Sequence, residues 1–197
     1  MRTSSSSSVE RVAIDMKKIS CIDSHPSKAL LVTSSLDRTA RIWDLRQMKS
    51  KNGSVKPIAE QTCRLSVSSG YFSPSGAKVI TTGMDDTIKV WDYTETPKTK
   101  PSTSEKATVV TKHYNQTGRW VTNFRAKFIG ENHFHIGNMK RSVDIYAENG
   151  VLVRQLSDDE HMTAIPAVND YHPGHGELAA GTHGKVHIYS NTDDSRQ

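Results

Sequence analysis

Four segments of the chain repeat one layout of strands and turns, and this repetition limits the possible folds more than any other feature. Each segment has a short strand pattern, a Pro/Gly/Ser turn, a second strand ending in small residues, a tight polar turn, and a strand that closes on an aromatic residue. The segments are residues 19–46, 66–93, 121–148 and 164–190. Strands of this length at this spacing, without the period of a helix, indicate an all-β repeat protein.

The first two repeats close on a Trp-Asp pair, in the sequences RIWDLR and KVWDYT. Around Trp43 and Trp91 polar and apolar residues alternate, as a strand buried on one face requires. The third and fourth repeats close on Tyr146 and Tyr189 instead. Asp residues in the turns LDRTA and DDTIK can bond the backbone of those turns. These features resemble the WD-repeat β-propellers, in which each repeat supplies the strands of one blade.

The chain supplies about four blades, whereas propellers of this class usually close with seven. Residues 9–14 and 55–62 look like outer blade strands, but only SNTDDSRQ follows Tyr189. Either residues 9–14 complete the last blade across a ring, or the chain is the C-terminal part of a seven-bladed propeller; we expect the second arrangement. The sequence therefore divides into a disordered Ser-rich tail (1–8), a partial WD-repeat propeller (9–190) and a flexible C-terminal tail (191–197).

The composition excludes several other classes of protein. The chain is 35% hydrophobic and 24% charged, and it contains no apolar run long enough to span a membrane. Its net charge of +5 is compatible with an anionic partner but does not demonstrate one. Cys21 and Cys63 lack the spacing of metal ligands, so we expect two unpaired thiols in a reducing compartment.

Motifs of catalysis and of metal binding are missing from the sequence. It has no Gly-rich phosphate loop with a Lys, no nucleophile elbow and no HExxH. His133 and His135 share one strand face, and HPGH holds His172 and His175, but neither pair has an evident third ligand. We therefore expect no metal, no cofactor and no enzymatic activity.

Several motifs, in order along the chain, resemble one family of WD-repeat proteins. They are SSLDRTARIWDLRQ, YFSPSGAKVITTGMDDTIKVWD, NQTGRWVTNFRAKF, HIGNMKRSVDIY and MTAIPAVNDYHP. Together they are similar to the WD repeat-containing protein 76 family and, more distantly, to damage-specific DNA-binding protein 2. The resemblance covers about residues 9–190. It implies a nuclear, chromatin-associated protein that binds DNA in the DNA damage response. Relatives of this family can also be substrate receptors of cullin-4 ubiquitin ligases.

Candidate DNA contacts gather on one face of the expected propeller. Loops that enter the first strand of a blade and loops between its second and third strands project from the same face. That face is rich in cations, which phosphate recognition needs, with Asp85 and Asp86 as the acidic exception. The candidate DNA-binding residues are Arg38, Lys112, Arg119, Trp120, Arg125, Lys140, Arg141 and Lys185.

Trp120 has two interpretations at this stage. At a loop tip, its ring could wedge into the minor groove or stack on an unstacked base. Gly118, Arg119 and Trp120 align with the DNA-probing hairpin of damage-specific DNA-binding protein 2, although the residues there differ. Alternatively, Trp120 is buried at the start of a strand, with Arg125 on the polar side of that strand.

The opposite face carries the sequence WDLR, which matches the WDxR signature of propellers that dock on the adaptor of cullin-4 ligases. By this resemblance Trp43, Asp44 and Arg46 are candidate adaptor-binding residues. Arg is suited to such charge-assisted docking. The sequence thus favours a non-enzymatic DNA-binding WD-repeat protein. The alternative is a cullin-4 substrate receptor or chromatin scaffold whose ligands are proteins.

Overall fold

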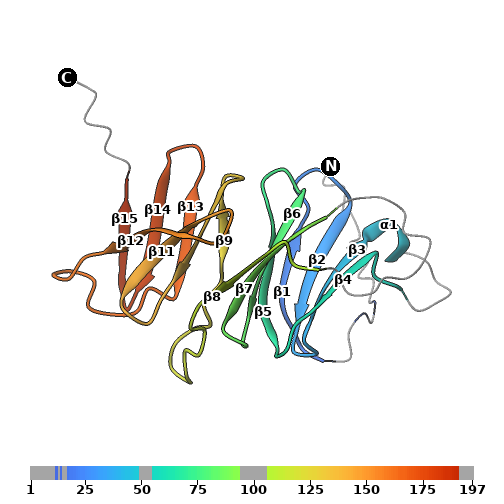
Figure 1. Ribbon diagram of the computed structural model, residues 1–197, viewed down its shortest axis with the longest axis horizontal. Helices are drawn as coiled ribbons and strands as arrows, with labels where there is room; N and C mark the ends of the chain where they lie inside the picture. The colour runs from blue at the N-terminus through green and yellow to red at the C-terminus, as the bar shows by residue number, and fades with distance from the viewer. Residues whose placement is uncertain (1–11, 13, 15–16, 49–54, 94–105, 191–197) are drawn as a thin grey trace, which may run out of the picture.

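Four antiparallel sheets, formed one after another along the chain, contain nearly all of the regular structure (Figure 1). The computed structural model describes residues 12, 14, 17–48, 55–93 and 106–190. The expected tails, 1–8 and 191–197, lie outside these residues, as does most of the expected outer strand at 9–14. Within the described ranges, no helix has the length and apolar character needed to cross a bilayer.

Each sheet is one blade, with its strands paired in sequence order. Blade 1 consists of β1 (Ile19–Ser24), β2 (Leu30–Ser35), β3 (Thr39–Asp44) and β4 (Ala59–Thr62), and a one-turn helix, α1 (Leu45–Met48), follows β3. Blade 2 consists of β5 (Val67–Phe72), β6 (Lys78–Gly83), β7 (Thr87–Asp92) and β8 (Val109–Lys112). Blade 3 consists of β9 (Lys127–Ile129), β10 (His133–Gly137), β11 (Ser142–Ala147) and β12 (Leu152–Ser157). Blade 4 has three strands in the described part of the chain, β13 (Val168–His172), β14 (Glu177–Thr182) and β15 (Lys185–Tyr189).

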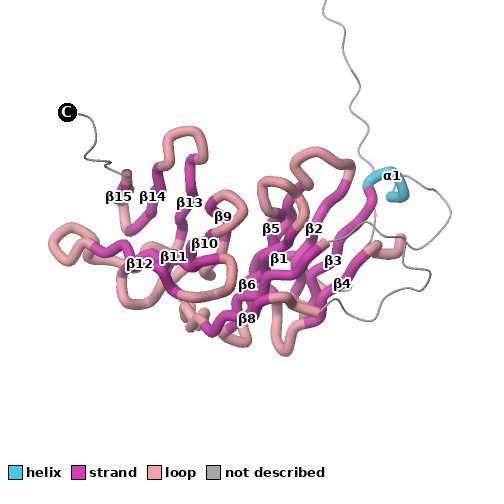
Figure 2. The backbone as a smooth tube through the Cα atoms, turned by 45° about the horizontal axis from the view of Figure 1, so that its top comes forward, coloured by secondary structure: helices cyan, strands magenta, loops and turns pink. Residues whose placement is uncertain are grey.

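The blades stand side by side in chain order, as the tube in Figure 2 shows. The first strands of neighbouring blades contact one another, so β1, β5, β9 and β13 form the inner edge of the array. The prediction of an all-β chain that supplies about four blades of a propeller is thereby confirmed. The outer strand expected within 55–62 is β4.

Apolar side chains fill the spaces between the blades and form one core at each blade interface. Val32 and Ile42 of blade 1 meet Val79 and Trp91 of blade 2. The second core holds Ile80 and Val90 of blade 2 against Phe134 of blade 3, and the third joins blades 3 and 4. The alternation of apolar residues along each strand produces this arrangement, because every second side chain points to the same face. Each buried aliphatic or aromatic side chain contributes roughly 1.5–3 kcal/mol.

Blades 3 and 4 approach so closely that one position on β10 excludes a side chain. A Cβ atom on Gly137 would lie 1.9 Å from the backbone oxygen of Pro166. Beside it, the Nδ1 atom of His135 lies 2.7 Å from Oδ1 of Asn169 across the same interface. His135 is fully buried, and burial lowers its pKa to about 4. The imidazole is therefore neutral at physiological pH.

Candidate functional site

The turns between the second and third strands of all four blades share one unusual backbone conformation. One residue in each turn has a positive φ: 76° at Arg38, 58° at Asp86, 63° at Arg141 and 70° at Gly184. For a residue with a Cβ atom, the left-handed region costs about 1 kcal/mol, so Gly or Asn is usual there. Two blades nevertheless place Arg at this position. Strained positions of this kind concentrate at functional sites.

Polar side chains next to these residues hold the turns in that shape. In blade 1, Oδ1 of Asp37 accepts hydrogen bonds from the backbone N and the hydroxyl of Thr39, at 3.0 and 2.6 Å. In blade 3, Oδ1 of Asn138 accepts from the backbone N of Lys140 at 2.8 Å. Asp and Asn favour turns because they form such local bonds. The exposed side chain of Arg141 is therefore displayed by a turn whose shape is fixed by its neighbours.

The loop between β8 and β9 is anchored on the turn of blade 2. The backbone N of Asn115 donates to Oδ1 of Asp86 at 2.8 Å, and its side-chain Nδ2 donates to the carbonyl of Gly83 at 2.8 Å. Asp86, an acidic residue on a face where cations are expected, thus has a structural role. Beyond this anchor Gly118 adopts a φ of 71°, and Arg119 and Trp120 project from the loop.

Trp120 is 96% exposed, which overturns the alternative of a Trp buried at the start of a strand. The strand begins only at Lys127, because pairing with β10 extends no further than that residue. Arg125 therefore precedes the strand and is not part of its polar side. It interacts with the phenol of Tyr71, whose pKa burial raises to about 12.

Two cavities group some of the candidate DNA-binding residues. Trp120 and Arg141 line the first, of about 520 Å³, together with His183 of the turn in blade 4. Lys112 and Lys140 line the second, of about 340 Å³, together with Tyr114. The remaining candidates lie elsewhere: Arg38, Arg119, Arg125 and Lys185 line neither cavity.

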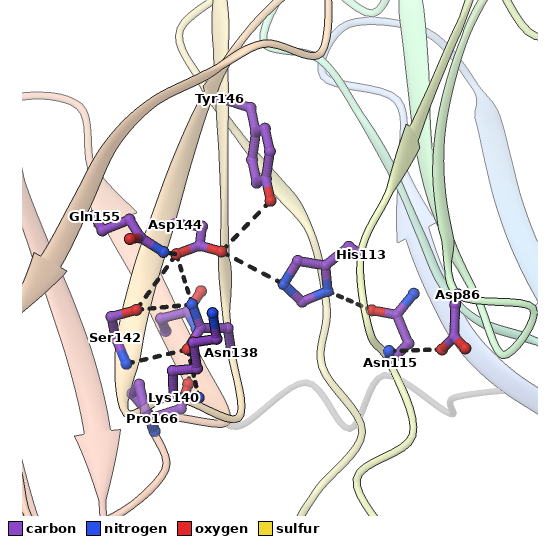
Figure 3. Close-up of polar contacts among 11 residues, drawn as sticks. Asp86, His113, Asn115, Asn138, Lys140, Ser142, Asp144, Tyr146, Gln155 and Pro166 are labelled. Atoms are coloured by element: carbon purple, nitrogen blue, oxygen red, sulfur yellow. Dashed lines mark hydrogen bonds and ion pairs between the residues drawn. The ribbon is translucent and has the colours of Figure 1, made fainter.

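Several residues that line the second cavity also belong to a buried polar network that joins blades 2 and 3 (Figure 3). The Nδ1 atom of His113 lies 2.7 Å from Oδ1 of Asn115, and its Nε2 atom lies 3.8 Å from Oδ2 of Asp144. Burial lowers the pKa of His113, against the opposing effects of Asn115 and Asp144. The Asp144 carboxylate accepts hydrogen bonds from the side-chain amides of Asn138 at 2.7 Å and Gln155 at 2.9 Å.

Sequence reasoning missed His113, Tyr114 and Asp144 as members of a site. The buried and exposed residues of KHYN alternate as they would in any strand, so the pattern carries no sign of a cavity. A partial signal was the exposed aromatic between two cations, because Tyr114 lies between Lys112 and Arg119 in the sequence.

At the opposite end of blade 1, only one of the three candidate adaptor-binding residues is available to a partner. Trp43 is buried, and its indole N–H donates to the Thr33 hydroxyl at 2.9 Å. Asp44 is also buried, and hydrogen bonding from Arg46 lowers its pKa. The side chain of Arg46 is 78% exposed and donates to both Asp44 carboxylate oxygens, at 2.9 and 2.7 Å.

Among the described residues, no three or more His, Cys, Asp or Glu side chains form a cluster that could hold a metal ion. Both cysteines, Cys21 and Cys63, are free thiols, as the sequence predicts. The described loops and turns display cations and aromatic rings on the surface, among them Arg141, Lys140, Trp120 and Tyr114.

Repeats, blades and displayed turns together define a WD-repeat propeller segment. The family description "WD domain, G-beta repeat" matches residues 15–44 and 57–92. The chain therefore contains WD repeats and is similar to the fungal proteins named DNA damage-binding protein CMR1, which confirms the resemblance drawn from the motifs.

Three of these relatives illustrate the similarity. The protein of Phaeosphaeria nodorum is 42% identical over an alignment of 196 positions that covers 92% of this chain and 37% of the relative. The protein of Neurospora crassa is 40% identical over 89% of this chain and 36% of its own length. The protein of Aspergillus terreus is 37% identical over 96% of this chain and 38% of its own length. The chain thus spans little more than a third of the length of these relatives.

Proposed function

We propose that this chain is the DNA-binding part of a non-enzymatic WD-repeat protein that acts on chromatin in the nucleus during the DNA damage response. The names of its relatives support a role connected with DNA damage. The net charge of +5 favours an anionic partner. Cations at several blades of one face suit a polymer of phosphates better than a single small anion.

The observation that carries the proposal is the pairing of Arg141 with Trp120 at one cavity. Arg141 has a left-handed backbone that Gly would adopt without strain. The Arg side chain therefore has a function that offsets the cost of this backbone conformation. Trp120 exposes almost its whole ring, which a purely structural Trp does not do. The Arg would neutralise a backbone phosphate, and the ring would insert at a step that damage has made easier to open.

Arg141→Gly separates DNA binding from folding. Because Gly suits a φ of 63°, the variant should be at least as stable as the wild type in urea denaturation. Its affinity for duplex DNA should fall for all sequences alike, and the slope of log affinity against log salt should decrease by about one. Arg154→Ala removes one charge from the exposed outer strand β12 and is the matched control. Equal affinity of Arg141→Gly and wild type would refute the proposal.

Trp120→Ala tests the aromatic wedge. Since the ring is exposed, its loss should change the free energy of unfolding by less than about 0.5 kcal/mol. In fluorescence anisotropy, the variant should lose more affinity for a mismatched duplex than for an intact one, because the wedge acts where base pairs open easily. A loss that is the same for both duplexes would contradict the wedge.

A second candidate function, docking on the cullin-4 adaptor, is favoured by Arg46. Its guanidinium is exposed and held in one orientation by Asp44, as a docking residue requires. The proposal predicts that Arg46→Ala abolishes co-purification of the adaptor with the protein while DNA binding persists. Co-purification that survives this substitution would exclude the docking mode.

A further inference from the structure

Two exposed aromatic rings stand on the loop between β8 and β9. Tyr114 is 59% exposed, and Trp120 is 96% exposed. The anchor of this loop on the turn of blade 2 lies between the two rings. Closer to the second ring, the hydroxyl of Thr117 donates to Oδ1 of Asn123 at 3.2 Å and closes the tip that carries Trp120. The loop is therefore fixed beside both rings, so little conformational entropy is lost when a ligand binds them.

Exposed cations connect the two rings along the surface. Lys112 and Lys140 line the second cavity beside Tyr114. Arg141 lines the first cavity beside Trp120. Because Lys140 and Arg141 are consecutive residues, the two cavities adjoin at the turn of blade 3. In the described part of the chain, no carboxylate pairs with any of these three cationic side chains. The two rings and three cations form one strip, which we call the cation–aromatic strip.

Beyond Tyr114 the strip ends, because the surface no longer carries an excess of positive charge. A third cavity, of about 410 Å³, shares Lys112 and Tyr114 with the second. It is also lined by Arg64 and by two acidic residues, Asp85 and Asp86. The two carboxylates offset the charges of Lys112 and Arg64, so this cavity does not attract a phosphate.

Aromatic rings interleaved with cations suit a single strand of nucleic acid. Every base has a π face that can stack on a Tyr or Trp ring, and every phosphate can be neutralised by a Lys or Arg. A duplex keeps its bases stacked inside the helix, so it would use the cations of the strip without covering both rings. An acidic peptide would likewise offer negative charges without planar rings.

We infer that the cation–aromatic strip binds a single strand of DNA. One base stacks on Tyr114 and another on Trp120. Lys140 and Arg141 contact the phosphates between these bases. The contacts are made to ring faces and phosphates at the surface, so they do not depend on the identity of the bases. This inference rests on the proposed DNA binding and adds a ligand for the strip, namely the strand that Trp120 separates from a damaged duplex.

The test compares two single-stranded probes that carry the same number of phosphates. One is an oligothymidylate of about 16 nucleotides, the upper end of the site sizes of single-strand binding folds. The other has the same length but is abasic throughout, with a tetrahydrofuran spacer in place of each nucleoside. At one salt concentration, wild-type protein should bind the oligothymidylate roughly a hundredfold more tightly, since each of two stacked bases contributes about tenfold. Comparing ligands on the unmodified protein avoids any effect on folding.

Variants of exposed residues show whether the rings cause this preference. Tyr114→Ala should lower the affinity for oligothymidylate about tenfold and leave that for the abasic probe unchanged. Tyr114→Phe should keep the wild-type preference, because the ring face remains. Trp120→Ala should act as Tyr114→Ala does. Val110→Ala is the matched control, since Val110 is 58% exposed on β8 but lies outside the strip, and it should bind both probes as the wild type does.

Two results would overturn the inference. The first is equal affinity of wild-type protein for the two probes, which would show that charge alone holds the strand. The second is an equal loss of affinity for both probes in Tyr114→Ala. A wild-type protein that still binds duplex DNA in these cases retains the proposed function, whereas failure to bind any DNA would refute the proposed function itself.

Discussion

His135, at the interface of blades 3 and 4, should make the protein sensitive to acid in a way that can be measured. Burial lowers its pKa from an ordinary 6.5 to about 4, against the hydrogen bond to Asn169 and the charge of Asp170, and Lys127 lowers it further. The unfolded chain therefore takes up a proton near pH 6.5, whereas the folded chain resists it. Stability that is present above that pH is lost as the pH falls toward 4.

The size of the pKa shift of His135 sets how much stability the protein loses on acidification. A difference of one pKa unit corresponds to 1.36 kcal/mol, so the full loss is about 3 kcal/mol, of which about 2 kcal/mol falls between pH 7 and pH 5. Urea denaturation, followed by the fluorescence of buried Trp43 and Trp91, measures the free energy of unfolding at each pH. His135→Asn retains an amide nitrogen close to the position of Nδ1 but carries no titratable ring. Its loss of stability between pH 7 and pH 5 should be about 2 kcal/mol smaller than that of the wild type.

Ile136→Ala supplies the control. It also opens a cavity on β10 but removes no titratable group, so its stability should be lower at both pH values with the wild-type pH dependence. If His135→Asn and wild type lose the same free energy on acidification, the account of a neutral, buried His135 is wrong.

Two further predictions concern the backbone and the opposite end of blade 1. Gly137→Ala should destabilise the protein by about 2 kcal/mol, because the added Cβ would lie 1.9 Å from the oxygen of Pro166; an unchanged urea midpoint would contradict this close packing. Asp44→Asn removes the carboxylate that holds Arg46, so trypsin should cleave after Arg46 faster than in the wild type while cleavage after the exposed Arg154 stays the same. Equal rates at Arg46 would show that the ion pair does not restrain this segment.

The blades could be predicted from the sequence because their signals are local. Alternation of apolar residues fixes the face of each strand, and the pairs Trp43–Asp44 and Trp91–Asp92 mark the third strand of blades 1 and 2. Turn residues between these patterns mark where the chain reverses. None of these inferences needs a contact between distant parts of the chain.

The site could be predicted only in part, because its geometry depends on neighbouring blades. The alternating residues from Arg125 to Phe128 read as part of a strand that Trp120 would begin, but pairing with β10 begins at Lys127 and leaves Trp120 in solvent. The cavity at Tyr114 needs the turn of the next repeat, with Lys140, to close its other side. Trp43 was a candidate contact because the WDxR pattern contains it, yet its own indole bond to Thr33 places it inside the fold.

The four blade turns share one left-handed backbone conformation although the residue that adopts it differs: Arg in two blades, Asp in one and Gly in one. Flanking polar groups such as Asp37 and Asn138 set the conformation, so the residue between them is free to vary. In blade 3 that freedom displays Arg141 outward, and in blade 2 it gives Asp86, which ties down the neighbouring loop. A single substitution at such a turn residue can therefore change which chemical group the propeller displays at its surface, while the strands of the blade stay the same.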